Sequence, residues 1–99
     1  MAEPIYKLWM FKLTEAWYQL SEEEQATHMA EVNESREKVG GKTIVMCNAI
    51  WASEPWMLFG VEEFPGIEAV QKHAADLFEA DHFRYFEGVS LLGVAWEPS

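Results

Sequence analysis

Apolar and polar positions along the chain follow two different periods, which predict four strands and two helices. Ile5–Leu13 (IYKLWMFKL) carries apolar side chains at both odd and even positions, which is typical of a strand covered on both faces. Residues 43–51 (TIVMCNAIW) and 56–63 (WMLFGVEE) flank the turn-forming segment 53–55 and favour an antiparallel hairpin. Residues 89–96 (VSLLGVAW) predict the last strand.

Two segments carry a helical pattern instead. Ser21, with Glu24 three positions later, forms a capping-box signature, so we expect a helix over residues 22–39 that ends at a Gly-Gly pair. The second predicted helix covers residues 67–79, where apolar residues recur on one stripe. The predicted inner face of the first helix is partly polar and consists of Gln25, His28, Met29, Val32, Arg36 and Val39.

The order strand, helix, hairpin, helix, strand predicts an α+β fold of the ferredoxin-like type, β-α-β-β-α-β. Two split β-α-β units of this kind give a four-stranded antiparallel sheet with both helices on one face. A length of 99 residues suits one domain, so we expect a single domain over 1–99. Because the strands are apolar on both sides, we also expect a second copy of the chain to cover the other face as a homodimer.

Composition narrows the classes of partner. The chain has 17 acidic residues against seven Lys and Arg, a formal net charge of −10, which disfavours binding to nucleic acid or to anionic membranes. No apolar run approaches the roughly 20 residues that span a bilayer, and the first residues lack the charged start of a signal peptide. Cys47 is the one cysteine and is expected to be a buried, inert thiol. We therefore expect a cytoplasmic protein whose apolar excess serves a subunit interface or a ligand pocket.

Two segments resemble a known superfamily. The element order, residues 73–88 (HAADLFEADHFRYFEG) and residues 16–24 (AWYQLSEEE) resemble the dimeric α/β barrel superfamily. Its members include antibiotic-biosynthesis monooxygenases, haem-degrading monooxygenases, muconolactone isomerases and plant polyketide cyclases, and the second segment resembles members without an assigned function. The resemblance implies a pocket between the sheet and the helices of each subunit, with a pocket histidine at the position of His82.

The resemblance and the residue types together suggest an enzyme without a metal or bound cofactor. It would act by proton abstraction on an aromatic or polyketide-like substrate, as a monooxygenase, cyclase or isomerase. In this hypothesis His82 is the general base, and Tyr85 or His28 stabilises the developing oxyanion. The expected ligand pocket consists of Trp9, Phe11, Asn48, Trp51, Phe78 and Phe86. The alternative is a non-catalytic dimeric protein that binds a small hydrophobic ligand, in which the histidines are dispensable.

The sequence has no HExxH, no HxH and no pair of cysteines, so no metal site is expected. The spacing from Phe78 to His82 is similar to that around the axial histidine of haem-degrading members, which keeps haem binding open as part of the alternative. Those members carry an asparagine on the first strand, and this strand has none, so haem degradation is not expected. His73 and Asp76 are expected to form a solvated surface pair, and Lys7 to snorkel from its strand.

Overall fold

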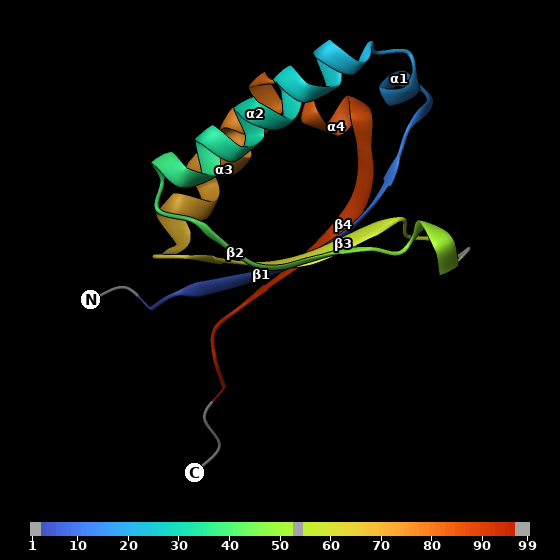
Figure 1. The fold of residues 1–99 in the computed structure, drawn as a ribbon. Coiled ribbons are helices and arrows are strands. Elements are labelled where there is room, and N and C mark those ends of the chain that lie inside the picture. The colour runs from blue at the N-terminus through green and yellow to red at the C-terminus, as the bar shows by residue number, and fades with distance from the viewer. Residues whose placement is uncertain (1–2, 53–54, 97–99) are drawn as a thin grey trace.

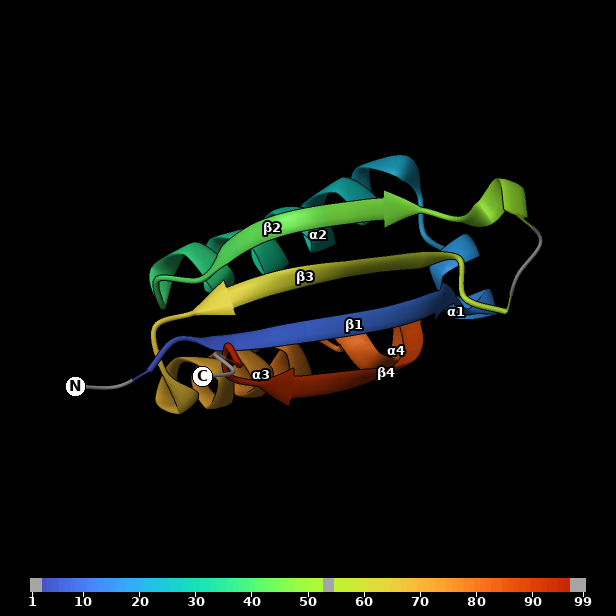
Figure 2. The same ribbon diagram turned by 90° about the horizontal axis from the view of Figure 1, so that it is seen from below.

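The computed structural model describes residues 3–52 and 55–96, and it confirms the ferredoxin-like fold. Four antiparallel strands form one sheet in the order β2-β3-β1-β4, and the helices lie on one face of it (Figure 1). The view from below shows the opposite sheet face, which no described helix covers (Figure 2). The elements in chain order are β1 (Ile5–Leu13), α1 (Glu15–Tyr18), α2 (Glu22–Lys38), β2 (Lys42–Asn48), η1 (Ile50–Ala52), β3 (Leu58–Phe64), α3 (Ile67–Glu79), α4 (His82–Tyr85) and β4 (Phe86–Gly93).

Helix α2 begins where the sequence predicts, because the capping box forms. The Ser21 hydroxyl accepts a hydrogen bond from the Glu24 amide at 3.1 Å, and the Glu24 carboxylate accepts one from the Ser21 amide at 2.9 Å. The helix ends at Lys38, and Gly40 takes the left-handed conformation, with φ of 84°, that reverses the chain toward β2. Of the predicted inner face His28, Val32 and Arg36 are buried.

The hairpin of β2 and β3 is confirmed, but the bounds of β2, β3 and β4 differ from the prediction by one to three residues. β2 stops at Asn48 because the Asn48 side chain accepts a hydrogen bond from the Ile50 amide at 2.9 Å and turns the chain into η1. β4 begins three residues earlier than expected, since Phe86 already pairs with Leu13 of β1. The predicted turn at 53–54 lies outside the described residues.

The core lies between the sheet and the helices. Cross-strand pairing places Trp9 opposite Gly60 and Phe11 opposite Gly88, so each aromatic ring lies over a residue without a side chain. A Cβ at Gly60 would lie 2.7 Å from the Trp9 ring, and one at Gly88 would lie 2.2 Å from the Phe11 ring. The buried apolar residues are Trp9, Val32, Phe64, Val70, Leu77 and Phe86.

The sheet face turned away from the helices is apolar as well. The register aligns Leu8 with Val61 and Leu91, and Met10 with Phe59 and Val89. Leu91 is 65% exposed, and no described segment packs over it. The described helices include none that is both long and apolar enough to cross a bilayer.

Candidate functional site

Two histidines from different helices meet under the helical layer. His28 on α2 and His82 on α4 share a hydrogen bond of 3.0 Å between Nε2 and Nδ1, and they are only 6% and 4% exposed. Their rings are stacked at 5.2 Å, and Phe86 stacks on His82 at 4.4 Å. Phe11 meets the His82 ring edge-on at 5.7 Å. The pair is therefore a rigid unit that closes the end of the core beneath α4.

The electrostatics of this pair keep it neutral. Burial, together with the neighbouring His28 and Lys7, lowers the pKa of His82 to about 3. Burial also lowers the pKa of His28, while the carboxylates of Glu31 and Asp81 act in the opposite direction. Near neutral pH one imidazole donates its proton to the other, and an added proton on His28 would be stabilised by the two carboxylates.

His28 also borders an open groove. Its Nε2 lies 3.0 Å from Nδ1 of His82, and the residue also lines the groove. Tyr85 stands beside it with a ring distance of 5.0 Å, and Trp17 meets both rings edge-on at 6.2 Å. The groove has a volume of about 340 Å³, and its lining consists of Leu20, Glu23, Glu24, Thr27, His28, Glu31, Ala80 and Tyr85.

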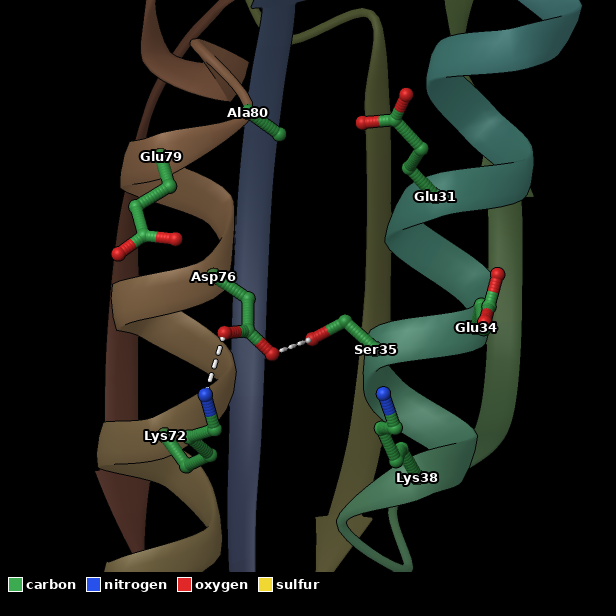
Figure 3. Close-up of a pocket in the computed structure, with 8 residues that line it drawn as sticks. All are labelled: Glu31, Glu34, Ser35, Lys38, Lys72, Asp76, Glu79 and Ala80. Carbon is green, nitrogen blue, oxygen red and sulfur yellow. Dashed lines mark hydrogen bonds and ion pairs between the residues drawn. The ribbon is translucent and has the colours of Figure 1, made fainter.

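A second buried imidazole is held by a serine and an aspartate. Ser35 Oγ of α2 lies 2.8 Å from His73 Nδ1 and 2.8 Å from Asp76 Oδ2, both on α3. Figure 3 shows the contact with Asp76. Because a carboxylate only accepts, Ser35 donates its one proton to Asp76, and His73 must donate from Nδ1. Asp76 also pairs with Lys72 at 2.9 Å. This network fixes the His73 tautomer and leaves its Nε2 without a proton.

The structure corrects the expectation of a solvated pair between His73 and Asp76. His73 is 2% exposed, and burial with the nearby charges of Lys7 and Arg36 lowers its pKa to about 4. Ser35 was missing from the predicted inner face of α2, although it lies three positions after Val32 and seven after His28. That helical spacing is the signal that could have identified it.

An ion pair lies farther along the same layer. Arg36 donates to Glu62 at 3.1 Å and to the side chain of Asn33, and both Arg36 and Glu62 are buried. Burial raises the pKa of Glu62, against the charges of Arg36 and Lys7, which lower it. Lys7 is the cross-strand neighbour of Glu62, and burial lowers the pKa of its ammonium. Lys7 thus lies on the helix-covered face of the sheet. It takes no part in the ion pair between Arg36 and Glu62.

A larger groove of about 510 Å³ runs between α2 and α3. Figure 3 shows Ser35 and Asp76 pointing toward each other across it, with Glu31 and Glu34 on the α2 side and Glu79 on the α3 side. The two grooves share Glu31 and Ala80, so they adjoin along the outer surface of the helices. Ser35, which bonds His73, lines the larger groove. His28, which bonds His82, lines the smaller groove.

The structure brings together some of the predicted site residues and separates others. His28, His82, Tyr85, Phe11 and Phe86 form one cluster, and Trp9 stacks on Phe11 at 5.2 Å. The rings of Trp9, Phe11 and Phe86 fill the space around His82 and line neither groove.

The other three predicted pocket residues lie elsewhere. Trp51 is 83% exposed in η1, where its indole donates to the Asn48 carbonyl at 3.0 Å. Phe78 is 77% exposed on α3, since it follows the buried Leu77 and points to the opposite side of the helix. Asn48 caps the turn after β2, so its polar partner is the backbone.

Phe86, Phe11 and Phe83 enclose the His82 ring, with Phe83 at 5.6 Å, so the residues as they stand do not fit a porphyrin. A haem bound to His82 would have to displace Phe86 or Phe11. Among residues 3–52 and 55–96, no three His, Cys, Asp or Glu side chains gather in a group that could hold a metal ion.

Comparisons with known proteins address the fold. No protein-family model matches the chain, and no curated protein matches it. A methylated RPA0582 protein has a TM-score of 0.70 at 18% identity over 99% of this chain and 84% of that one. RPA0582 is a protein of unknown function from Rhodopseudomonas palustris. A mutant chlorite dismutase from Candidatus Nitrospira defluvii has a TM-score of 0.76 at 16% identity over 99% of this chain, which spans 42% of that protein's length. At these identities the likeness establishes the ferredoxin-like fold, the fold on which dimeric α/β barrels are built.

Proposed function

We propose that this protein is a small-molecule enzyme that needs no bound cofactor and in which His28 abstracts a proton from a carbonyl compound. The observation that supports the proposal most is that His28, only 6% exposed, lines a groove while its Nε2 lies within hydrogen-bonding distance of His82. In the reaction a C–H bond of the substrate breaks and its proton forms an N–H bond at Nδ1. The electron pair moves to the carbonyl oxygen as an enolate.

The neighbouring residues have complementary roles in this proposal. We assign the proton of the 3.0 Å contact to His28, so that its Nε2–H donates to His82 Nδ1, orients the imidazole and leaves His28 Nδ1 without a proton. The Tyr85 hydroxyl, on the groove wall, donates a hydrogen bond to the enolate oxygen. Glu31 and Asp81 stabilise the imidazolium that forms. The roles of His28 and His82 are thus exchanged relative to the sequence hypothesis, because His28 is the one that borders the groove.

A deuterium-exchange experiment tests the proposal. Ethyl acetoacetate, a 1,3-dicarbonyl compound like those in polyketides, is incubated in D2O with the protein, and loss of its C2 proton signal is followed by NMR. We expect catalysed exchange that falls at least about tenfold in His28→Gln and severalfold in Tyr85→Phe. Glu37→Gln, a change on α2 outside both grooves, should leave the exchange unchanged. Equal exchange in wild type and His28→Gln, with both folded by circular dichroism, would contradict the proposal.

A second candidate is a non-catalytic dimeric protein that binds a small hydrophobic ligand. The tight aromatic packing around His82 favours it, since these rings would serve stability rather than chemistry. Because that packing as it stands does not fit a porphyrin, a Soret shift on titration with haem that disappears in His82→Ala would show that the rings rearrange, and it would support the binding protein.

The homodimer is also a proposal. A second copy is the occupant that best fits the uncovered sheet face. This face is apolar across β1, β3 and β4, and its apolar residues align across these three strands in two rows. Residues that a soluble monomer exposes there include Phe59, Val89 and Leu91.

A further inference from the structure

The one-turn helix α4 carries two residues of the proposed site. His82 begins it and Tyr85 ends it, and the rings of both lie beside the His28 ring, with centroid distances of 5.2 and 5.0 Å. A single turn is far shorter than the roughly 12–15 residues at which an isolated helix becomes marginally stable in water. Within the described chain the side chain of Asp81, which precedes the helix with a left-handed φ of 61°, makes no capping hydrogen bond. Other elements must therefore hold α4 in place.

Thr14, directly after β1, binds the end of α4 through two hydrogen bonds. Its amide donates to the Tyr85 carbonyl at 3.0 Å, and its hydroxyl donates to the Arg84 carbonyl at 2.6 Å. Both carbonyls belong to the last turn of α4, where a helix cannot satisfy its own acceptors. The amide bond continues the strand pairing of Leu13 with Phe86, and any residue except proline could supply it. The hydroxyl bond depends on the side chain at position 14.

The position of Thr14 in the chain would normally give its hydroxyl a different partner. Thr14 is the N-cap of α1, where a threonine oxygen ordinarily accepts a hydrogen bond from an amide in the first turn of its own helix. Among the described residues that bond is missing, and the hydroxyl is turned to α4 instead. Helix α1 is bound from α2, since Gln25 Nε2 donates to the Trp17 carbonyl at 3.1 Å. The Thr14 side chain thus supports α4 and not its own helix.

The turn that begins at Thr14 also places an indole against the site. The Trp17 amide donates to the Thr14 carbonyl at 3.1 Å. The Trp17 ring lies 5.1 Å from the Phe86 ring and meets the rings of His28 and Tyr85 edge-on at 6.2 Å each. Thr14 therefore joins the two short helices whose rings surround His28.

We propose that Thr14 is a positioning residue of the site, whose hydroxyl holds α4 where Tyr85 reaches the enolate oxygen and His82 orients His28. The inference rests on the proposed function. Thr14 is not among the residues that line the groove, so it acts through α4 and not on the substrate. The groove lining comes mainly from α2. A displaced α4 should therefore weaken the hydrogen bond to the developing oxyanion more than it weakens substrate binding.

Two substitutions separate the hydroxyl from the shape of the side chain. Thr14→Val keeps the shape and removes the donor, whereas Thr14→Ser keeps the donor. We expect Thr14→Val to lower kcat for ethyl acetoacetate exchange about three- to tenfold with KM nearly unchanged, and Thr14→Ser to keep most of the wild-type rate. The NMR signals of Tyr85 and His82 should shift in Thr14→Val and not in Thr14→Ser. Thr43→Val, the same change at an exposed residue of β2, should alter neither rates nor signals.

Three kinetic results would overturn the role of the hydroxyl, with every variant shown to be folded by circular dichroism. These are equal kcat in Thr14→Val and wild type, a Thr14→Ser variant as slow as Thr14→Val, and a raised KM at unchanged kcat. If wild-type exchange does not depend on His28, the proposed chemistry fails, and the NMR signals alone decide the role of Thr14. Signals of Tyr85 and His82 that shift in Thr14→Val and return in Thr14→Ser then support the placement of α4 by Thr14, and unchanged signals in Thr14→Val overturn it.

Discussion

At the scale of residues, the hydrogen bonds of each histidine decide which of its ring nitrogens carries a proton and which can accept one. His73 is held by Ser35, which is committed to Asp76, so its proton stays on Nδ1. His28 has a different constraint, because its Nε2 contacts His82 while the residue lines the groove. A histidine is therefore locked inside the core at position 73 and available to a ligand at position 28.

The Ser35 network gives a prediction about the tautomer of His73. In Ser35→Ala the donor Nδ1–H loses its acceptor, so we expect a larger share of the Nε2–H tautomer and a loss of about 1–3 kcal/mol in the free energy of unfolding. Long-range ¹H–¹⁵N NMR reports the tautomer, and urea denaturation reports the stability. Ser35→Thr keeps the hydroxyl and should keep the Nδ1–H form. An unchanged tautomer in Ser35→Ala would show that Ser35 does not set it.

The buried histidines also predict a loss of stability in acid. An unfolded histidine protonates near pH 6.5, whereas the folded pKa values are about 4 for His73 and about 3 for His82. As pH falls below about 6.5, the unfolded chain binds more protons than the folded one, so stability falls until the pH reaches the folded values. Each histidine contributes up to about 1.4 kcal/mol per pH unit in that window.

Urea denaturation midpoints between pH 7.5 and pH 4.5 check this prediction. His73→Gln is the informative variant, because it removes one titrating group while it keeps a polar side chain. Its stability should depend less steeply on pH than that of wild type. Equal slopes for the two proteins would contradict burial of a neutral His73.

At the scale of elements, the aromatic rings of β1 depend on glycines in the strands beside it. A Cβ at Gly88 would lie 2.0 Å from the Met10 carbonyl and 2.2 Å from the Phe11 ring, whereas a Cβ at Gly93 would meet nothing within 4 Å. We expect Gly88→Ala to lower the free energy of unfolding by about 1–3 kcal/mol or more, since backbone has to move. Gly93→Ala, in the same strand, should be close to neutral. Similar urea midpoints for the two variants would contradict the placement of Phe11 over β4.

The sequence predicts most elements, and the exceptions have physical causes. The bounds of α3 were predicted exactly as observed and those of α2 within one residue, because caps, glycines and helical periods are local signals. β4 was predicted to begin too late, since its first pairing, Phe86 with Leu13, joins residues far apart in the chain. The short helices α1 and α4 are about one turn long and have no period to detect.

The candidate site was predictable only in part. The resemblance directed attention to residues 73–88, and His82 is indeed central to the cluster. Which histidine borders the groove depends on how α2 and α4 pack, and no local pattern encodes that packing. Trp51 was assigned to a pocket by residue type and Phe78 also by its spacing from His82, and the packing leaves both exposed.

At the scale of the whole molecule, helices cover one sheet face and the other stays bare, which is the basis for the proposed homodimer. We expect the wild-type mass in solution to be about twice 11.4 kDa. Leu91→Glu places a charge in the middle of the bare face and should give a monomer. Ile67→Glu, an exposed apolar residue of α3 on the helical side, should leave the dimer intact.

Light scattering coupled to size exclusion measures these masses. A monomeric wild type, or a Leu91→Glu dimer, would indicate that a different occupant covers the bare face. Neither result would change the hydrogen bonds of His28, which lie within one chain.

The central claim is that His28 presents an unprotonated Nδ1 to the groove at neutral pH. Long-range ¹H–¹⁵N correlation NMR at pH 7 measures this directly, with His28→Gln used to assign the signals. The account predicts a neutral His28 in the Nε2–H form, whose Nδ1 signal moves when a ligand enters the groove. An Nδ1–H form, or an imidazolium at pH 7, would contradict it, because neither could accept a proton from a substrate there.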